Sequence, residues 1–113
     1  MSKQNRVLLK LVALKRQRAE QGLAIAQARR RELQAGLADL QAQLAAADAA
    51  QIDFQALSLS ARNGHVQRLL NKLADQQAQV EQSQACVAEA REELKRILNS
   101  EDQLLTMGPA ALP

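Results

Sequence analysis

Aromatic residues are almost missing from this chain of 113 residues, which has one Phe and neither Tyr nor Trp. A compact globular core usually depends on aromatic side chains, each of which buries roughly 150–250 Å². Turn-forming residues are also few, with four Gly and two Pro. Because β-branched residues are scarce as well, the sequence excludes a sheet of short strands joined by tight turns.

Histidine and cysteine occur once each, so one chain cannot supply the ligands of a zinc or iron–sulfur site. The glycine-rich motifs that bind phosphates are missing too. No apolar run approaches the roughly 20 residues that span a lipid bilayer. We therefore expect a protein that is not an enzyme, with no cofactor, no metal site and no small-molecule substrate.

Three residue types supply half of the chain, which contains 22 Ala, 19 Leu and 16 Gln. This composition is typical of long helices and coiled coils. In the first half of the sequence, positions at alternating steps of three and four are mostly apolar. The series has twelve positions, of which ten are apolar: Leu9, Val12, Arg16, Ala19, Leu23, Ala26, Arg30, Leu33, Leu37, Leu40, Leu44 and Ala47. A heptad pattern of this length predicts a coiled-coil helix.

A second series starts at Val66 and keeps an apolar residue at every seventh position up to Leu94, before Glu101 interrupts it. Between the two series, Asn63-Gly64 is the strongest turn dipeptide. The sequence therefore predicts an all-α fold, an antiparallel two-helix coiled-coil hairpin in a single domain. We expect helix 1 over about 5–50, the tip over about 51–64, helix 2 over about 65–106 and a disordered tail over 107–113.

Electric charge is distributed unevenly along the chain. Residues 1–31 carry nine Lys or Arg and one Glu, a net charge of +8, whereas residues 32–113 carry a net charge of −5. The basic end suits an acidic protein surface, nucleic acid or anionic lipid, or it pairs with the acidic half when the chain folds back. The lack of aromatic side chains argues against binding of single-stranded nucleic acid, which usually stacks its bases on aromatic rings. Binding to the phosphate backbone of a duplex remains compatible with the sequence. The segment Val7–Leu14, surrounded by Lys and Arg, also has the pattern of a helix on a membrane surface.

Four single residues call for an interpretation. Arg16 and Arg30 occupy positions of the heptad series that are otherwise apolar, where they either contact an acidic partner or fix the register of the helices. Phe54 either closes the tip of the hairpin or forms part of an apolar docking surface. Cys86 is expected to fill a small apolar space between the helices.

The basic first helix and its Gln-, Ala- and Arg-rich surface resemble a known family, most clearly in the stretch NRVLLKLVALKRQRAEQGLAIAQARRRELQ. The chain resembles the central stalk proteins of type III secretion ATPases, called FliJ in flagella and SctO or YscO in injectisomes. Its short length is closer to the injectisome branch. The resemblance covers roughly residues 4–106.

The resemblance implies an antiparallel two-helix coiled coil and a set of protein partners. The end with both termini would enter the pore of the hexameric secretion ATPase, and the other end would reach the ring protein of the export gate. Some family members also handle export chaperones. The implied location is the cytoplasm, at the cytoplasmic face of the secretion apparatus, with contact to a membrane only indirectly through that apparatus.

The resemblance also suggests which residues bind these partners. The residues expected to contact the ATPase are Arg6, Lys10, Lys15, Arg16, Arg18, Leu98 and Leu105. Those expected near the export gate are Phe54, Leu57, Ala61, His65, Val66, Leu70 and Leu73. The flagellar member is associated with a gate-contacting pattern Phe-x3-Leu-x2-Ala-x3-His, and two sets of residues compete for it. One set is Phe54, Ser58, Ala61 and His65, and the other is Val66, Leu70, Leu73 and Gln77.

Two other functions are compatible with the same sequence. A basic coiled coil that binds nucleic acid would show duplex binding with a steep salt dependence. A generic scaffold would form a homodimer through the apolar faces of its helices.

Overall fold

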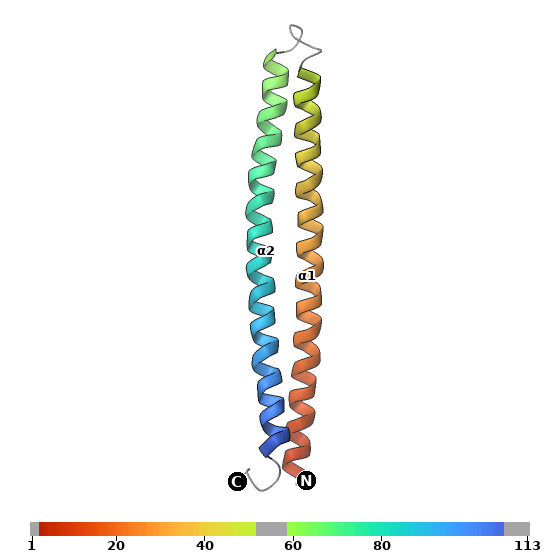
Figure 1. Ribbon diagram of the computed structural model, residues 1–113, viewed down its shortest axis with the longest axis vertical. Helices are drawn as coiled ribbons and strands as arrows, with labels where there is room; N and C mark the ends of the chain where they lie inside the picture. The colour runs from red at the N-terminus through yellow and green to blue at the C-terminus, as the bar shows by residue number, and fades with distance from the viewer. Residues whose placement is uncertain (1–2, 52–58, 108–113) are drawn as a thin grey trace. The chain divides into compact units, whose positions relative to one another are not determined.

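The structure of the chain, a computed structural model, consists of two long α-helices (Figure 1). Helix α1 spans Lys3–Gln51 and helix α2 spans Leu59–Met107, with 49 residues each. The structure describes residues 3–51 and 59–107, and it describes side chains over 3–47 and 64–106. Within these ranges every residue is helical and no strand occurs, which confirms the predicted all-α fold of two helices.

Contacts divide the chain into two compact units, named here by their place in the sequence. The terminal unit consists of Met1–Ala28 and Ala85–Pro113, and the middle unit is Arg29–Gln84. Each unit contains one segment of α1 and one segment of α2. In each, the two segments lie side by side and run in opposite directions, as the colours in Figure 1 show. The predicted antiparallel pairing is therefore confirmed within both units.

The amino-acid composition explains why both segments are helical throughout. Ala, Leu, Gln, Glu and Arg cost little free energy in a helix interior, and neither proline of the chain falls within α1 or α2. Charged residues at the helix ends add little stability. Acidic residues in the first turn and basic residues in the last turn stabilise a helix through its dipole, and α1 and α2 have neither. Packing between the helices must therefore supply most of their stability.

The side chains that face the other helix follow the predicted heptads. All twelve positions of the first series, from Leu9 to Ala47, are buried or half-buried. On α2 the same holds for a matching series of twelve: Val66, Leu69, Leu73, Gln76, Val80, Ser83, Val87, Ala90, Leu94, Ile97, Glu101 and Leu104. We call these two series the α1 seam and the α2 seam. Among the residues whose side chains are described, the buried apolar ones are Val87 in the terminal unit and Leu33, Leu69 and Val80 in the middle unit.

The start of the second helix differs from its prediction. Helix α2 begins at Leu59 instead of about residue 65, so the tip predicted over about 51–64 extends too far, and Asn63 and Gly64 are both helical. Gly64 also lacks the left-handed backbone that a tight reversal requires. Glycine costs only about 1 kcal/mol relative to alanine in a helix, so this local preference is outweighed by packing further along the helix.

The connection between the helices, residues 52–58, lies outside the described residues. The tail predicted over 107–113 begins with Met107, which is the last residue of α2, and its remaining residues also lie outside them.

A polar contact crosses the seam in the middle unit. The Nε2 amide of Gln76 donates a hydrogen bond to the backbone oxygen of Leu33 at 2.9 Å. Gly36 makes room for this side chain, because a Cβ atom at that position would lie 2.7 Å from Gln76 Nε2. In the same unit, the buried Ser83 hydroxyl donates to the oxygen of Val80 at 2.7 Å. Gln76 and Ser83, two polar residues of the α2 seam, are thus satisfied by hydrogen bonds, as buried polar groups generally must be.

Gly36 and Gly22 should respond differently to alanine. A Cβ at Gly22 would meet nothing within 4 Å, so Gly22→Ala should raise the free energy of unfolding by up to about 1 kcal/mol. Gly36→Ala should give a smaller gain or a loss, because the displaced Gln76 amide forfeits a hydrogen bond worth about 1 kcal/mol. Urea unfolding followed by circular dichroism measures both. Equal stabilisation by the two substitutions would contradict the contact between Gln76 and Gly36.

Candidate interaction surface

The residues expected to contact an ATPase all lie in the terminal unit, and six of the seven are exposed. Arg6, Lys10, Lys15 and Arg18 project from α1, while Leu98 and Leu105 are exposed on α2. None of the four cations has an ion-pair or hydrogen-bond partner among the described residues. The structure therefore leaves their charges available to a binding partner.

Arg16, the seventh residue, is bound within the chain instead. Its Nη1 donates to Glu101 Oε1 at 2.6 Å, and its Nε lies 3.6 Å from Glu20 Oε1. The side chain of Arg16 is 37% exposed and that of Glu101 is 16% exposed. This pairing favours the interpretation that Arg16 fixes the register of the helices. It also corrects the reading of Glu101 as an interruption, because Glu101 occupies a regular position of the α2 seam.

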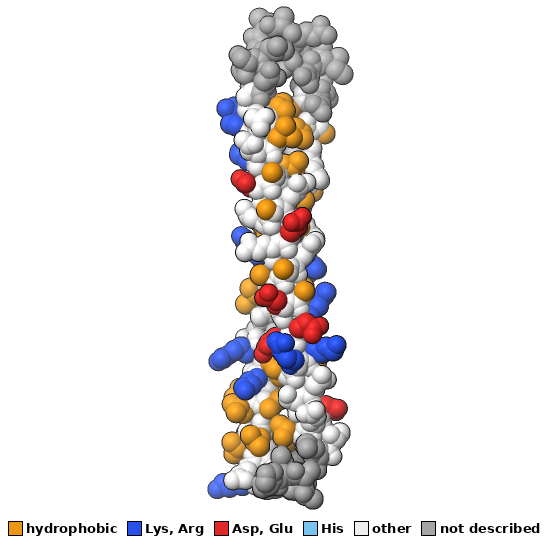
Figure 2. Space-filling model, turned by 90° about the vertical axis from the view of Figure 1, so that its left-hand side faces the viewer, with side chains coloured by type: hydrophobic (Ala, Val, Ile, Leu, Met, Phe, Trp, Pro, Cys, Tyr) orange, Lys and Arg blue, Asp and Glu red, His pale blue; other side chains and the backbone are white. Residues whose placement is uncertain are grey.

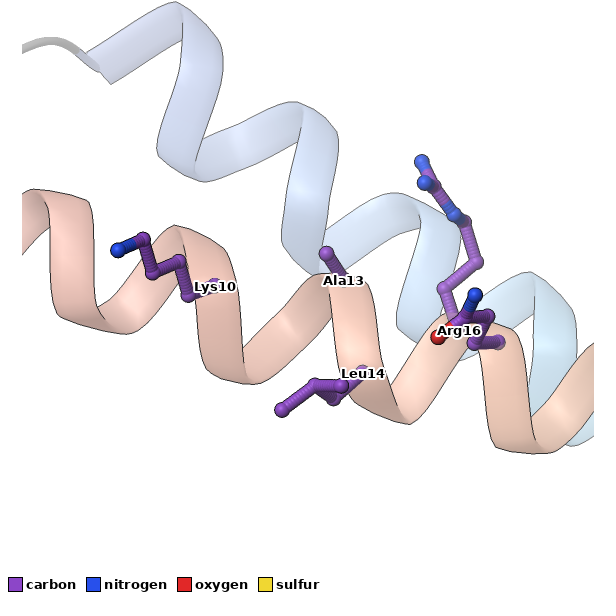
Figure 3. Close-up of a pocket in the computed structure, with 5 residues that line it drawn as sticks. Lys10, Ala13, Leu14 and Arg16 are labelled. Atoms are coloured by element: carbon purple, nitrogen blue, oxygen red, sulfur yellow. The ribbon is translucent and has the colours of Figure 1, made fainter.

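A second apolar face runs along the outer side of α1 in this unit. Val7, Leu11 and Leu14 are 60%, 48% and 62% exposed. Their spacing of four and three residues places them on one side of the helix. We call these three residues the outer stripe. Figure 3 shows Leu14 pointing away from α2 while Ala13 points towards it, so the outer stripe is distinct from the α1 seam.

Basic side chains accompany the outer stripe. The first acidic residue of the sequence is Glu20, so the first four turns of α1 carry only positive charge. Lys10 and Leu14 belong to one open hollow of about 380 Å³ on the surface of α1 (Figure 3). Figure 2 shows hydrophobic side chains gathered on the terminal unit beside Lys and Arg side chains. This surface combines apolar contact area with unneutralised positive charge.

An ion pair between residues of the same helix lies on α2 in the terminal unit. Arg96 Nη2 donates to Glu93 Oε2 at 2.7 Å, one turn earlier in the same helix. This hydrogen bond, together with the negative charge of Glu93, raises the pKa of Arg96 above its ordinary value. Cys86 is exposed on this helix, so its predicted role as a buried filler is wrong. The apolar position between the helices belongs to its neighbour Val87.

The residues expected near an export gate are only partly described. Phe54 and Leu57 lie outside the described residues, and so does the side chain of Ala61. His65 is exposed. Whether Phe54 closes the tip or docks on a partner therefore stays a prediction.

In the competing set, Val66 and Leu73 are half-buried in the α2 seam, whereas Leu70 and Gln77 are exposed beside it. The structure thus divides this set between internal packing and the surface. The second seam arginine, Arg30, is half-buried in the middle unit, and its Nε has no hydrogen-bond partner among the described residues. Both interpretations of Arg30 stay open.

Over the described ranges, no group of three or more His, Cys, Asp or Glu residues is arranged to hold a metal ion. Over the same ranges, neither helix is long and apolar enough to span a membrane.

The fold and this surface together define the class of the molecule as an antiparallel α-helical hairpin protein with a basic, partly apolar outer face. Comparison of the chain with protein-family models, with curated proteins and with solved structures finds no match.

Proposed function

We propose that this chain is a non-enzymatic stalk and coupling protein of a type III secretion system. Its terminal unit would insert into the hexameric export ATPase, and residues near the connection between its helices would contact the export gate. The observation that supports this proposal best is the set of exposed, unpaired cations on α1, of which Arg6 and Arg18 are examples. The resemblance of the sequence to stalk proteins supplies the particular partners, which also include export chaperones.

The charge of the terminal unit supports a partner with an acidic surface. Exposed cations that lack intramolecular partners attract acidic groups over a distance and accelerate association. Such attraction weakens as salt concentration rises, because the Debye length falls to about 8 Å at physiological ionic strength. Leu98 and Leu105 add exposed apolar area on the α2 side of the same unit. We therefore expect charge attraction to speed the association with the ATPase, and apolar side chains to form part of the contact area.

The test is the effect of the purified chain on the export ATPase of the same organism. We expect the chain to raise the rate of ATP hydrolysis or the fraction of hexamer. The double substitution Arg6→Glu and Arg18→Glu should weaken this effect by about tenfold or more at low salt, and by less at high salt. Arg16 is left unchanged in this variant. Its substitution would break the pair with Glu101 and lower the stability of the fold, so an effect on ATPase binding could not be separated from an effect on folding.

The matched control reverses two exposed cations on α2 in the same unit, with Arg91→Glu and Lys95→Glu. This variant should keep the effect on the ATPase. Absence of both binding and stimulation across a concentration series would reject the proposal. A gel shift with duplex DNA at moderate salt, and sedimentation of the chain alone, test the nucleic-acid and homodimer alternatives in the same preparation.

A further inference from the structure

We propose that the outer face of α1 in the terminal unit docks directly on an anionic membrane surface. The face consists of the outer stripe, formed by Val7, Leu11 and Leu14, with the basic side chains along its edges. This inference goes beyond the proposed coupling function, in which contact with a membrane is only indirect. Lys10, Lys15 and Arg18 belong to both proposed surfaces, so the terminal unit would bind the membrane and the ATPase in turn and not at the same time.

The first observation is that the start of α1 is apolar on two sides. One side is the α1 seam, where Leu9 and Val12 are half-buried against α2. The other side is the outer stripe, which α2 leaves open to solvent. A surface helix of a globular protein normally has a single apolar side. The second apolar side therefore indicates that something outside the described residues covers it.

The second observation is the arrangement of charge around the outer stripe. With about 3.6 residues per turn, Lys10 lies along one edge of the stripe and Lys15 along the other, while Arg18 continues its line. All three side chains are exposed and lack an ionic partner among the described residues. An apolar centre with cations on both edges is the pattern of a helix that lies in the interface of an anionic bilayer.

Lysine side chains suit this position because of their shape. A long aliphatic stem can lie along the acyl boundary while the ammonium group reaches the phosphate of a lipid headgroup. The surface between Lys3 and Val7 forms an open apolar hollow that also includes Gln4 and Leu8. Leucine and valine side chains of the stripe would enter the boundary between headgroups and acyl chains at the same depth.

The same charges disfavour the most obvious alternative occupant. If the outer stripe of a second copy covered this one, the lysines along both stripes would face like charges in a desolvated interface. Like charges brought together in this way oppose association. An anionic lipid surface instead supplies negative charge on every side of the stripe, and it requires no groove of matching shape.

The test is co-sedimentation of the purified full chain with lipid vesicles. One preparation contains phosphatidylcholine alone, and the other contains phosphatidylcholine and phosphatidylglycerol in equal parts. We expect the chain to bind the anionic vesicles at least about tenfold more tightly, with affinity that falls as salt is raised. Comparable binding to both preparations, or no binding to either, would overturn the proposal.

Two pairs of variants locate the binding face. Leu11→Gln with Leu14→Gln should weaken binding to the anionic vesicles by about tenfold or more, because the apolar contact is lost. Lys10→Gln with Lys15→Gln should also weaken it and should flatten the salt dependence. The matched controls lie on α2 of the same unit and should bind as the unchanged chain does. They are Leu105→Gln, at a residue 58% exposed, and Lys95→Gln.

Circular dichroism of every variant confirms that the helices persist, since all the substituted residues are exposed. Equal losses in a control and in its test variant would overturn the proposal. A third outcome would also overturn it: the unchanged chain binds no vesicles, and Leu11→Gln/Leu14→Gln no longer stimulates the ATPase. The outer stripe would then be a contact surface for a protein. The vesicle experiment contains no ATPase, so its failure and the failure of the coupling function are separate results.

Discussion

Leu69→Ala should lower the free energy of unfolding by about 2–3 kcal/mol, because it truncates a buried leucine in the seam of the middle unit. Leu69 is 4% exposed, whereas its neighbour Leu70 is 41% exposed. The lower part of the range for buried leucine is expected, since a two-helix seam has open edges into which neighbouring side chains can relax. Chemical denaturation followed by circular dichroism at 222 nm, a standard helix wavelength, gives the value.

Leu70→Ala is the matched control, because it removes the same atoms one residue further along the same helix. We expect it to lower the free energy of unfolding by less than about 1 kcal/mol. The two substitutions have the same effect on helix propensity, so the difference between them measures burial against α1. A result in which Leu70→Ala costs as much as Leu69→Ala would place the wrong face of α2 in the seam.

The second large effect is expected at the ion pair of Arg16 and Glu101 in the terminal unit. Arg16→Leu should lower the free energy of unfolding by about 1–3 kcal/mol, because it leaves the largely buried Glu101 carboxylate without its partner. Glu101→Leu should cost less, because Arg16 is more exposed and stays 3.6 Å from Glu20. The order of the two losses is therefore part of the prediction.

The double substitution Arg16→Leu/Glu101→Leu should restore the stability of the unchanged chain or exceed it. Replacing both members of a buried pair by apolar residues removes the cost of an uncompensated charge. A double-mutant cycle measures this coupling. As a control, Glu93→Gln breaks the exposed pair with Arg96 and should leave stability unchanged within error. Additive losses at Arg16 and Glu101 would show that the two residues do not interact.

Much of the fold follows from the heptad pattern, because helix packing depends mainly on which side of each helix is apolar. Every position of the first series proved buried or half-buried, including Arg16 and Arg30, which the pattern assigned to the seam despite their charge. The same pattern gave the column from Val66 to Leu94 on α2. In the structure the α2 seam continues through Glu101. The sequence pattern predicted that the heptad series ends there, because Glu101 is not apolar.

The remaining features depend on contacts between residues far apart in the sequence. Arg16 and Glu101 are 85 residues apart, and only their opposite charges in opposing series could have suggested that they pair. The start of α2 was misplaced because the preference of Asn63-Gly64 for a turn is local, whereas the packing that overrides it comes from α1. The hydrogen bond from Gln76 to Leu33 likewise depends on the space that Gly36 leaves on the opposing helix, which no local sequence pattern indicates.

Only part of the candidate interaction surface could be predicted from the sequence. The sequence left open whether the basic end pairs with the acidic half of the chain, and the structure shows Arg6, Lys10 and Arg18 exposed. The sequence could not tell which apolar residues of Val7–Leu14 face α2 and which face solvent, because that segment contains both the seam and the outer stripe. The distinction required the orientation of α1 against α2.

Two hydrogen bonds described above, each joining α1 to α2, also have a consequence for the order of folding. Leu33 and Gln76 are 43 residues apart, and Arg16 and Glu101 are 85 residues apart. Each doubling of the chain length enclosed by a contact adds about 0.6 kcal/mol to the entropic cost of closing it. Contact between Gln76 and Leu33 is therefore cheaper to form from the unfolded chain, and it brings the partners of the longer closure nearer. Pairing of α1 with α2 should thus begin near the middle of the sequence and proceed towards the chain ends. The basic segment of α1 should be the last to pair with α2 during folding and the first to separate from it during unfolding.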